Sequence, residues 1–79
     1  MSSLVYSTVK MIKVNSSDIN AVDYDYQRKT LTILFHSGGK YEYYNVPLNV
    51  YNSLLSAESK GRYFDKFIKH YYQYRKINI

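Results

Sequence analysis

The chain contains no cysteine and no tryptophan, and only one proline and three glycines occur among its 79 residues. Without cysteine, neither a disulfide framework nor a thiolate metal site can form. The two histidines, His36 and His70, lie far apart and lack metal-ligand spacing, so we expect no metal and no other cofactor. No apolar run is long enough to cross a membrane, and Met1–Lys10 lacks the apolar core of a secretory signal. These absences predict a cytoplasmic protein that does not bind membranes.

Tyrosine is the residue that the chain has in excess, at 11 of 79 positions. Its ring and hydroxyl allow it to fill a core, to stack on a nucleic-acid base or to line an interface. A hydrophobic content of 46% is typical of a globular domain, and the short length predicts one domain with a small core. The most informative tyrosines are in Tyr41-Glu42-Tyr43, directly after the turn Ser37-Gly38-Gly39.

Alternating side chains predict three strands, at 22–26, 31–36 and 41–44, with Gln27-Arg28-Lys29 connecting the first two. We expect a three-residue second turn, Ser37-Gly38-Gly39, with Gly39 in the left-handed conformation. This turn would place Tyr41 opposite Phe35 and Tyr43 opposite Ile33. The predicted buried face is Val22, Tyr24, Tyr26, Leu31, Ile33, Phe35, Tyr41 and Tyr43, with Tyr24, Phe35, Tyr41 and Tyr43 as its core motif. The predicted outer face is Asp23, Asp25, Thr32, Leu34, His36, Glu42 and Tyr44.

Two helices are predicted to follow the strands. Pro47 suits the first turn of a helix, and Gly61 is a plausible stop for it. A second, amphipathic helix is predicted over 63–72, where aromatic and aliphatic residues recur in adjacent pairs every four positions. The prediction is an α+β domain in which a three-stranded antiparallel β-sheet is followed by two helices packed on one face. We expect an N-terminal arm at 1–13, either a short strand or a loose extension, the domain at 14–73 and a C-terminal tail at 74–79.

The net charge of +5 is concentrated near the C-terminus, with +1 over residues 1–57 and +4 over residues 58–79. Phosphate attraction and base stacking need cations and aromatic rings, and Tyr71, Tyr72 and Tyr74 lie among these cations. The candidate nucleic-acid-binding residues are Lys60, Arg62, Lys66, Lys69, Arg75 and Lys76. A solvated helix face would show the same charge pattern, and the sequence does not choose between the two interpretations.

Two further motifs bear on chemistry. Ser59, Lys60, Gly61 and Arg62 combine a hydroxyl, two cations and a flexible backbone near a helix start, which is a candidate anion-binding site. A simple helix–helix turn capped by Ser59 is the alternative. Gly38-Gly39 lacks the following Lys-Ser/Thr of a phosphate loop, and we find no recognisable nucleophile and base, so the chain is predicted not to be an enzyme.

Several segments together resemble the KTSC domain family, a module at the C-terminus of some lysyl-tRNA synthetases that also occurs as short bacterial and phage proteins. The resemblance spans Val14 to Tyr72 and rests on the order and spacing of its segments. These are Val14-Asn15-Ser16-Ser17-Asp18-Ile19, Tyr24-Asp25, Leu31-Thr32-Ile33-Leu34-Phe35, Ser37-Gly38-Gly39, Tyr41-Glu42-Tyr43, Val46-Pro47 and Ala57-Glu58-Ser59-Lys60-Gly61-Arg62-Tyr63-Phe64.

The chain is small, basic and tyrosine-rich, and the resemblance implies that it is bacterial or phage-encoded, with the cytoplasm as its expected location. Its link to synthetases favours RNA binding, which the C-terminal cations would support. If RNA binds, we expect it at the basic C-terminal helix, because Asp23, Asp25 and Glu42 would repel phosphate from the open sheet face. The alternative is a protein-interaction module, such as a homo-oligomer or a phage effector that binds a host protein, with Met1–Lys10 making the partner-specific contact.

Overall fold

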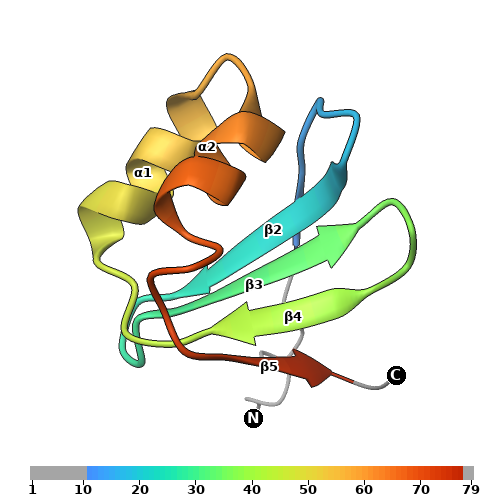
Figure 1. Ribbon diagram of the computed structural model, residues 1–79. Coiled ribbons are helices and arrows are strands. Elements are labelled where there is room, and N and C mark those ends of the chain that lie inside the picture. Colours follow the sequence, from blue (N-terminus) through green and yellow to red (C-terminus); the bar gives the residue numbers. More distant parts are fainter. Residues whose placement is uncertain (1–10, 78–79) are drawn as a thin grey trace, which may run out of the picture.

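The computed structural model describes residues 11–77 as a five-stranded antiparallel sheet with two helices on one face (Figure 1). The elements are β1 (Ile12–Lys13), β2 (Ile19–Asp25), β3 (Thr30–Phe35), β4 (Lys40–Tyr43), α1 (Leu48–Ser56), α2 (Lys60–Phe67) and β5 (Tyr74–Ile77). The strands lie side by side in the order β1-β2-β3-β4-β5. The α+β class and the packing of both helices on one face are confirmed.

The predicted number of strands is wrong, because the sheet has five strands where three were expected. β1 pairs with β2 through Ile12 and Val22, and β5 pairs with β4 through Tyr74 and Tyr43. Both added strands are short edge strands, and all their side chains are exposed except that of the half-buried Ile77. An edge strand without a buried face lacks the apolar alternation from which strands are predicted. Parts of the predicted arm and tail thus belong to the sheet, whereas residues 1–10 lie outside the described residues.

The turn between β3 and β4 has the expected length, but its position is shifted. Its loop is His36-Ser37-Gly38, and Gly38, not Gly39, adopts the left-handed conformation with φ +102°. The Phe35 N–H donates to Gly39 O at 2.9 Å, and the Gly38 N–H donates to Phe35 O at 2.9 Å. Tyr41 therefore pairs with Ile33, where Phe35 was predicted. In the same way, Tyr43 pairs with Leu31, where Ile33 was predicted. The turn begins one residue earlier than predicted, so the pairing partner of each β4 residue shifts by two positions along β3. Because this shift is an even number, the side chains of β3 and β4 keep their predicted faces.

The core lies between the sheet and the helices. Its buried side chains are Ile19, Val22, Tyr24, Leu31, Ile33, Tyr43, Val46, Tyr51, Leu54, Phe64 and Ile68. Of the predicted core motif, Tyr24 and Tyr43 are buried, and Phe35 and Tyr41 pack against the core from its margin. Tyr26 was predicted to be buried but is 66% exposed. It lies past the end of β2, in the hairpin, and its ring packs edge-on against Tyr24 with 5.1 Å between centroids.

The helix bounds also differ from the prediction. α1 begins directly after Pro47, as expected. Gly61, however, lies inside α2 and does not stop α1, because Ser59 caps α2 with its Oγ accepting the Arg62 N–H at 3.3 Å. α2 ends at Phe67, so the predicted helix over 63–72 is too long. The chain turns after the buried Ile68, and the Tyr44 N–H donates to Gln73 O at 2.9 Å, which leads the chain into β5. Sheet pairing here overrides the helical pattern.

Candidate functional site

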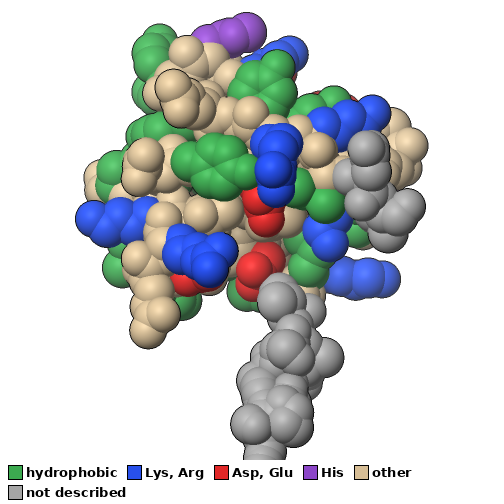
Figure 2. All heavy atoms as spheres, turned by 90° about the horizontal axis from the view of Figure 1, so that it is seen from below, with side chains coloured by type: hydrophobic (Ala, Val, Ile, Leu, Met, Phe, Trp, Pro, Cys, Tyr) green, Lys and Arg blue, Asp and Glu red, His purple; other side chains and the backbone are tan. Residues whose placement is uncertain are grey.

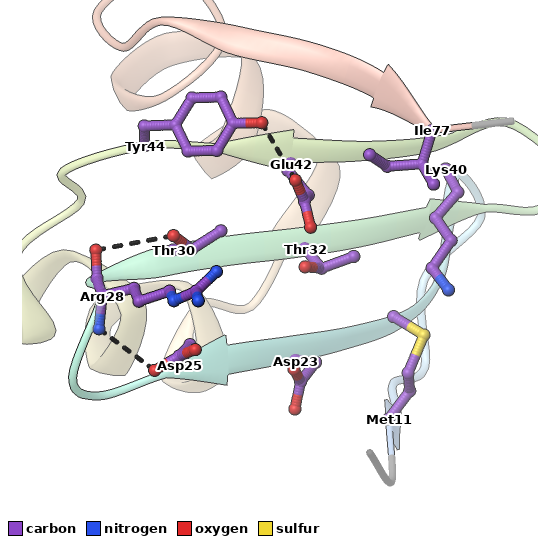
Figure 3. A pocket seen from close by; sticks show the side chains of 10 residues that line it. All are labelled: Met11, Asp23, Asp25, Arg28, Thr30, Thr32, Lys40, Glu42, Tyr44 and Ile77. Carbon is purple, nitrogen blue, oxygen red and sulfur yellow. Dashed lines mark hydrogen bonds between the residues drawn. The ribbon is translucent and has the colours of Figure 1, made fainter. Parts of the chain in front are cut away.

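The sheet face away from the helices is open and carries a polar trough of about 220 Å³, which we call the open-face trough (Figure 3). It is lined by Met11, Asp23, Asp25, Arg28, Thr30, Thr32, Lys40, Glu42, Tyr44 and Ile77. Figure 2 shows this side of the molecule, with acidic side chains near the middle and Lys and Arg side chains around them.

Three hydrogen bonds already engage the carboxylates of the open-face trough. Tyr44 Oη donates to Glu42 Oε1 at 2.9 Å, and this bond raises the pKa of Tyr44. Asp25 Oδ1 accepts the backbone N–H groups of Gln27 at 3.0 Å and Arg28 at 3.1 Å. Partial burial raises the pKa of Asp23, and the nearby Asp25 raises it further. The three carboxylates share this face as expected, but Arg28, Lys40 and the neighbouring Arg75 lie on it as well, so the exclusion of phosphate from this face stays a prediction.

The helix side of the sheet contains a second hollow, at the β4–β5 edge, which we call the aromatic cleft. It encloses about 350 Å³ and is lined by Phe35, Ser37, Tyr41, Tyr43, Lys69, His70 and Tyr74. β3, the following hairpin and β4 supply its floor, and the turn after α2 supplies Lys69 and His70. Tyr74 stands opposite Tyr43 in the β4–β5 pairing, so both rings lie on this face.

The rings of the aromatic cleft form a continuous group that runs from the core to the surface. Tyr43 packs edge-on against Phe64 at 5.3 Å between ring centroids and is 4% exposed. Tyr74 lies 5.5 Å from Tyr43 and 5.9 Å from Tyr41, and it is 57% exposed. Burial raises the pKa of Tyr43 to about 12. Tyr43 therefore anchors the group in the core, and Tyr74 presents an aromatic surface to solvent.

Two of the six predicted cations border the aromatic cleft. Lys69 lines it, and Lys76 Nζ lies 6.0 Å from the centroid of the Tyr41 ring, since Lys76 stands opposite Tyr41. Such a separation is within the range of a cation–π interaction. At the aromatic cleft, Lys69 and Lys76 thus lie near aromatic rings, among them Tyr41, that the sequence interpretation had assigned to the core.

The other four predicted cations lie elsewhere. Lys66 Nζ lies 5.6 Å from the Phe67 ring centroid on α2, and Lys60 Nζ donates to Ala57 O at 3.0 Å. Arg75 stands opposite Glu42 and so belongs to the open face. Arg62 is exposed in the first turn of α2. The six residues therefore do not form one continuous surface.

The predicted anion site at Ser59–Arg62 coincides with the first turn of α2. A Cβ built on Gly61 would lie 2.8 Å from Asp18 Oδ2, so a carboxylate of the chain itself already lies against this turn. A helix N-terminus favours such a negative charge. The anion site stays a prediction, and the position of Asp18 makes the capped helix start the better account of these residues.

A further hollow, which we call the α1–α2 aromatic patch, lies on the outer side of the helices. It is an open hollow with a volume of about 410 Å³, and it is lined by Val50, Tyr63, Phe67, Tyr71 and Tyr72. Phe67 is 48% exposed and Tyr71 is 70% exposed. Contiguous exposed rings of this kind are typical of an interaction surface.

Metal-binding and membrane-spanning features are both missing from the described part of the chain. Within residues 11–77, no three His, Asp or Glu side chains gather in a way that could hold a metal ion. In the same residues, neither helix has the length and apolar character needed to cross a membrane.

The aromatic cleft was not predicted, because sequence reasoning assigned Tyr41 and Tyr43 wholly to the core and left Tyr74 in a tail. Residues 74–77 show no apolar alternation that would have indicated β5, because two cations stand side by side between Tyr74 and Ile77. Phe35 and His70 carry no pattern that would place them together, since they meet only through the turn after α2.

Comparison with known proteins places most of the chain in one family. The KTSC domain matches residues 15–74. A lysine–tRNA ligase of a Nostoc species is 44% identical over 68 residues, which cover 86% of this chain and 12% of the ligase. A protein of Stutzerimonas stutzeri is 35% identical over 89% of this chain and 100% of its own length. The crystal structure of a KTSC domain protein from Yersinia pestis matches with a TM-score of 0.86 at 38% identity, covering 90% of this chain and 100% of that one. The chain thus corresponds to a small part of the ligase and to the full length of the smaller relatives.

Proposed function

The chain belongs to the KTSC domain family, and we propose that it is a non-enzymatic domain that binds RNA at the aromatic cleft, through the cations of the turn after α2 and of β5. The observation that carries this proposal is the meeting of cations with exposed rings at the aromatic cleft, where Lys69 and Lys76 lie beside Tyr41 and Tyr74. Lysine ammonium groups attract phosphates whatever the sequence, and aromatic rings add surfaces on which bases stack.

The family relationships support the same proposal. One relative contains this domain within a lysine–tRNA ligase, a protein whose name specifies tRNA. A small domain joined to such an enzyme has RNA within reach, and positive charge on one surface raises the rate and strength of its encounter with a polyanion. The Stutzerimonas stutzeri relative matches over its whole length, so the domain also exists on its own, and we propose that the same surface serves there.

Fluorescence anisotropy with labelled single-stranded, hairpin and tRNA-like RNAs, at low and near-physiological salt, tests this function. The Lys69→Glu, Lys76→Glu double variant removes both cations of the aromatic cleft. It is expected to weaken binding and to lower the log–log salt slope by about 0.7–0.9 for each phosphate that is no longer neutralised. The matched control is Lys13→Glu with Lys29→Asp, which makes the same charge change on β1 and in the β2–β3 hairpin, where Lys29 has a positive φ that Asp tolerates.

The comparison of the two double variants decides the proposal. If binding at near-physiological salt falls only in the Lys69→Glu, Lys76→Glu variant, the cleft cations carry the interaction. Equal losses in both double variants would show that only the net charge matters. An affinity unchanged by Lys69→Glu with Lys76→Glu would exclude the aromatic cleft as the binding surface.

Protein binding is the second candidate function, and the α1–α2 aromatic patch is the observation that favours it. Exposed aromatic side chains are enriched at the centres of protein interfaces. Phe67→Ser should abolish capture of a partner held through this patch. Met1–Lys10 was predicted to make the partner-specific contact and lies outside the described residues, so a chain that lacks this segment tests that prediction separately. If partner capture survives the deletion, the arm does not carry the contact.

A further inference from the structure

We propose that the aromatic cleft holds one unpaired RNA base, stacked on Tyr74 and bordered by Tyr41, with flanking phosphates near Lys69 and Lys76. This inference rests on the proposed RNA-binding function and identifies its ligand as single-stranded RNA. It predicts a preference for RNA in which a base is free to leave its neighbours. Lysines on a flat surface would bind duplex and single strand through phosphates alone.

The exposure of the rings is the first argument. Tyr74 is 57% exposed although it lies within 6 Å of both Tyr41 and Tyr43, so it is held by its neighbours without being covered. The ring planes are tilted by 52° for Tyr41–Tyr74 and by 31° for Tyr43–Tyr74. Rings packed in this way are pre-positioned, so less conformational entropy is lost when a base stacks on them.

The shape of the cleft is the second argument. Its volume of about 350 Å³ is at the small end of ligand sites, which range over roughly 300–1,000 Å³. A space of this size suits one base and not an extended polymer surface. One wall is aromatic and the other carries Lys69 and His70, so an aromatic base and its phosphate would each meet a complementary group.

The position of the charges is the third argument. Lys69 lies in the turn after α2, which is fixed because the Lys69 N–H donates to Phe64 O at 2.9 Å. Lys76 lies on β5, on the face that bears Tyr41. The cleft is therefore flanked by a cation from each of two separate elements, as a strand that passes across it requires. The open-face trough offers the opposite arrangement, with carboxylates at its centre.

The first test compares two labelled probes on the unmodified protein. One is a short oligouridylate, and the other is an abasic ribose-phosphate chain of the same length and charge. Tighter binding of the oligouridylate at near-physiological salt is expected. Because one stacked base contributes a factor of roughly 5–150 in affinity, a difference in that range would indicate a base in the cleft.

Variants then locate the stacked base. Tyr74→Leu is expected to remove most of the difference between the two probes and to leave the salt slope unchanged, because the phosphate contacts remain. Tyr74→Phe is expected to keep the difference, since stacking needs the ring and not the hydroxyl. Tyr71→Leu is the matched control, because Tyr71 is 70% exposed but lies in the α1–α2 aromatic patch.

The outcomes separate this inference from the function on which it rests. Equal binding of the two probes overturns the base-holding cleft while leaving electrostatic RNA binding in place. The same conclusion follows if Tyr74→Leu and Tyr71→Leu behave alike. Failure of every RNA to bind at near-physiological salt overturns both proposals. Should Tyr74→Leu fail to fold, the probe comparison on the unmodified protein still decides.

Discussion

Replacing Tyr24 by Phe removes one buried hydrogen bond and little else. Tyr24 Oη donates to Val46 O at 2.6 Å, and Val46 is fully buried. The ring of Tyr24 stacks on Tyr51 with 4.7 Å between centroids and 11° between planes. Phe retains this stack, so the change isolates the bond that fastens β2 to the segment leading into α1.

The expected cost follows from the burial of the carbonyl that loses its donor. An unsatisfied buried acceptor costs about 1–3 kcal/mol, so we expect Tyr24→Phe to lower the free energy of unfolding by about 1–2 kcal/mol. In a domain of this size each kcal/mol lowers the melting temperature by about 4–8 °C. The variant should still fold, because the ring keeps its apolar burial.

Urea unfolding followed by circular dichroism measures this difference, and an unchanged m-value shows that the same surface is exposed on unfolding. Tyr26→Phe is the control, because Tyr26 is 66% exposed and its hydroxyl loss should change stability by less than about 0.5 kcal/mol. If the two variants are equally stable, the Tyr24–Val46 bond does not stabilise the fold, and the reasoning is refuted.

Three other predictions concern single positions. Gly38→Ala should destabilise the protein by about 1–2 kcal/mol in urea unfolding, because its φ of +102° is strained for any residue with a Cβ; an unchanged stability would contradict the observed turn. Gly61→Ala should be less favourable than the same change in an Asp18→Ala background, since the new Cβ would meet Asp18 Oδ2 at 2.8 Å; a double-mutant cycle with no coupling would show that the carboxylate moves away freely. The pKa of Tyr43, raised from its ordinary 10 to about 12, favours the neutral phenol in the folded state, so its contribution is complete below pH 10 and is lost as the pH rises toward 12. The free energy of unfolding, measured by urea titration, should fall by about 1–3 kcal/mol between pH 10 and pH 12, and it should fall by less in Tyr43→Phe. Equal falls in the two proteins would contradict a raised pKa of Tyr43.

The central sheet could be predicted because its signal is local. Residues 22–26 and 31–36 alternate, and the face of each side chain depends only on even spacing from its neighbours. The predicted pairing between β3 and β4 was wrong by two residues, and for this reason each side chain of these strands still lay on its predicted face. What local pattern could not give was the choice between Gly38 and Gly39 for the left-handed position. Both are glycines, and either conformation costs little in the chain alone.

The edge strands and the end of α2 could not be predicted, because they depend on partners distant in the sequence. β5 exists because β4 offers it an edge, and its exposed residues Tyr74, Arg75 and Lys76 have no apolar alternation. The pattern over 63–72 is helical, but after Ile68 the pairing with β4 draws the chain away from the helix. Helix propensity has little influence where pairing with another strand satisfies the backbone N–H and C=O groups that a helix would otherwise pair.

The same edge strand explains why the candidate site was only half anticipated. The cations of residues 58–79 were visible as a charge count, whereas their division between two faces became visible only with β5 in place. Pairing sends Lys76 to the face of Tyr41 and sends Arg75 to the face of Glu42. One face of β5 therefore adds a cation to aromatic rings, and the other adds a cation to carboxylates, where its charge is offset. The proposed RNA-binding surface thus depends on the register of β5 against β4 as much as on the net charge. A change that shifted this register by one residue would exchange the two faces while leaving the composition unaltered.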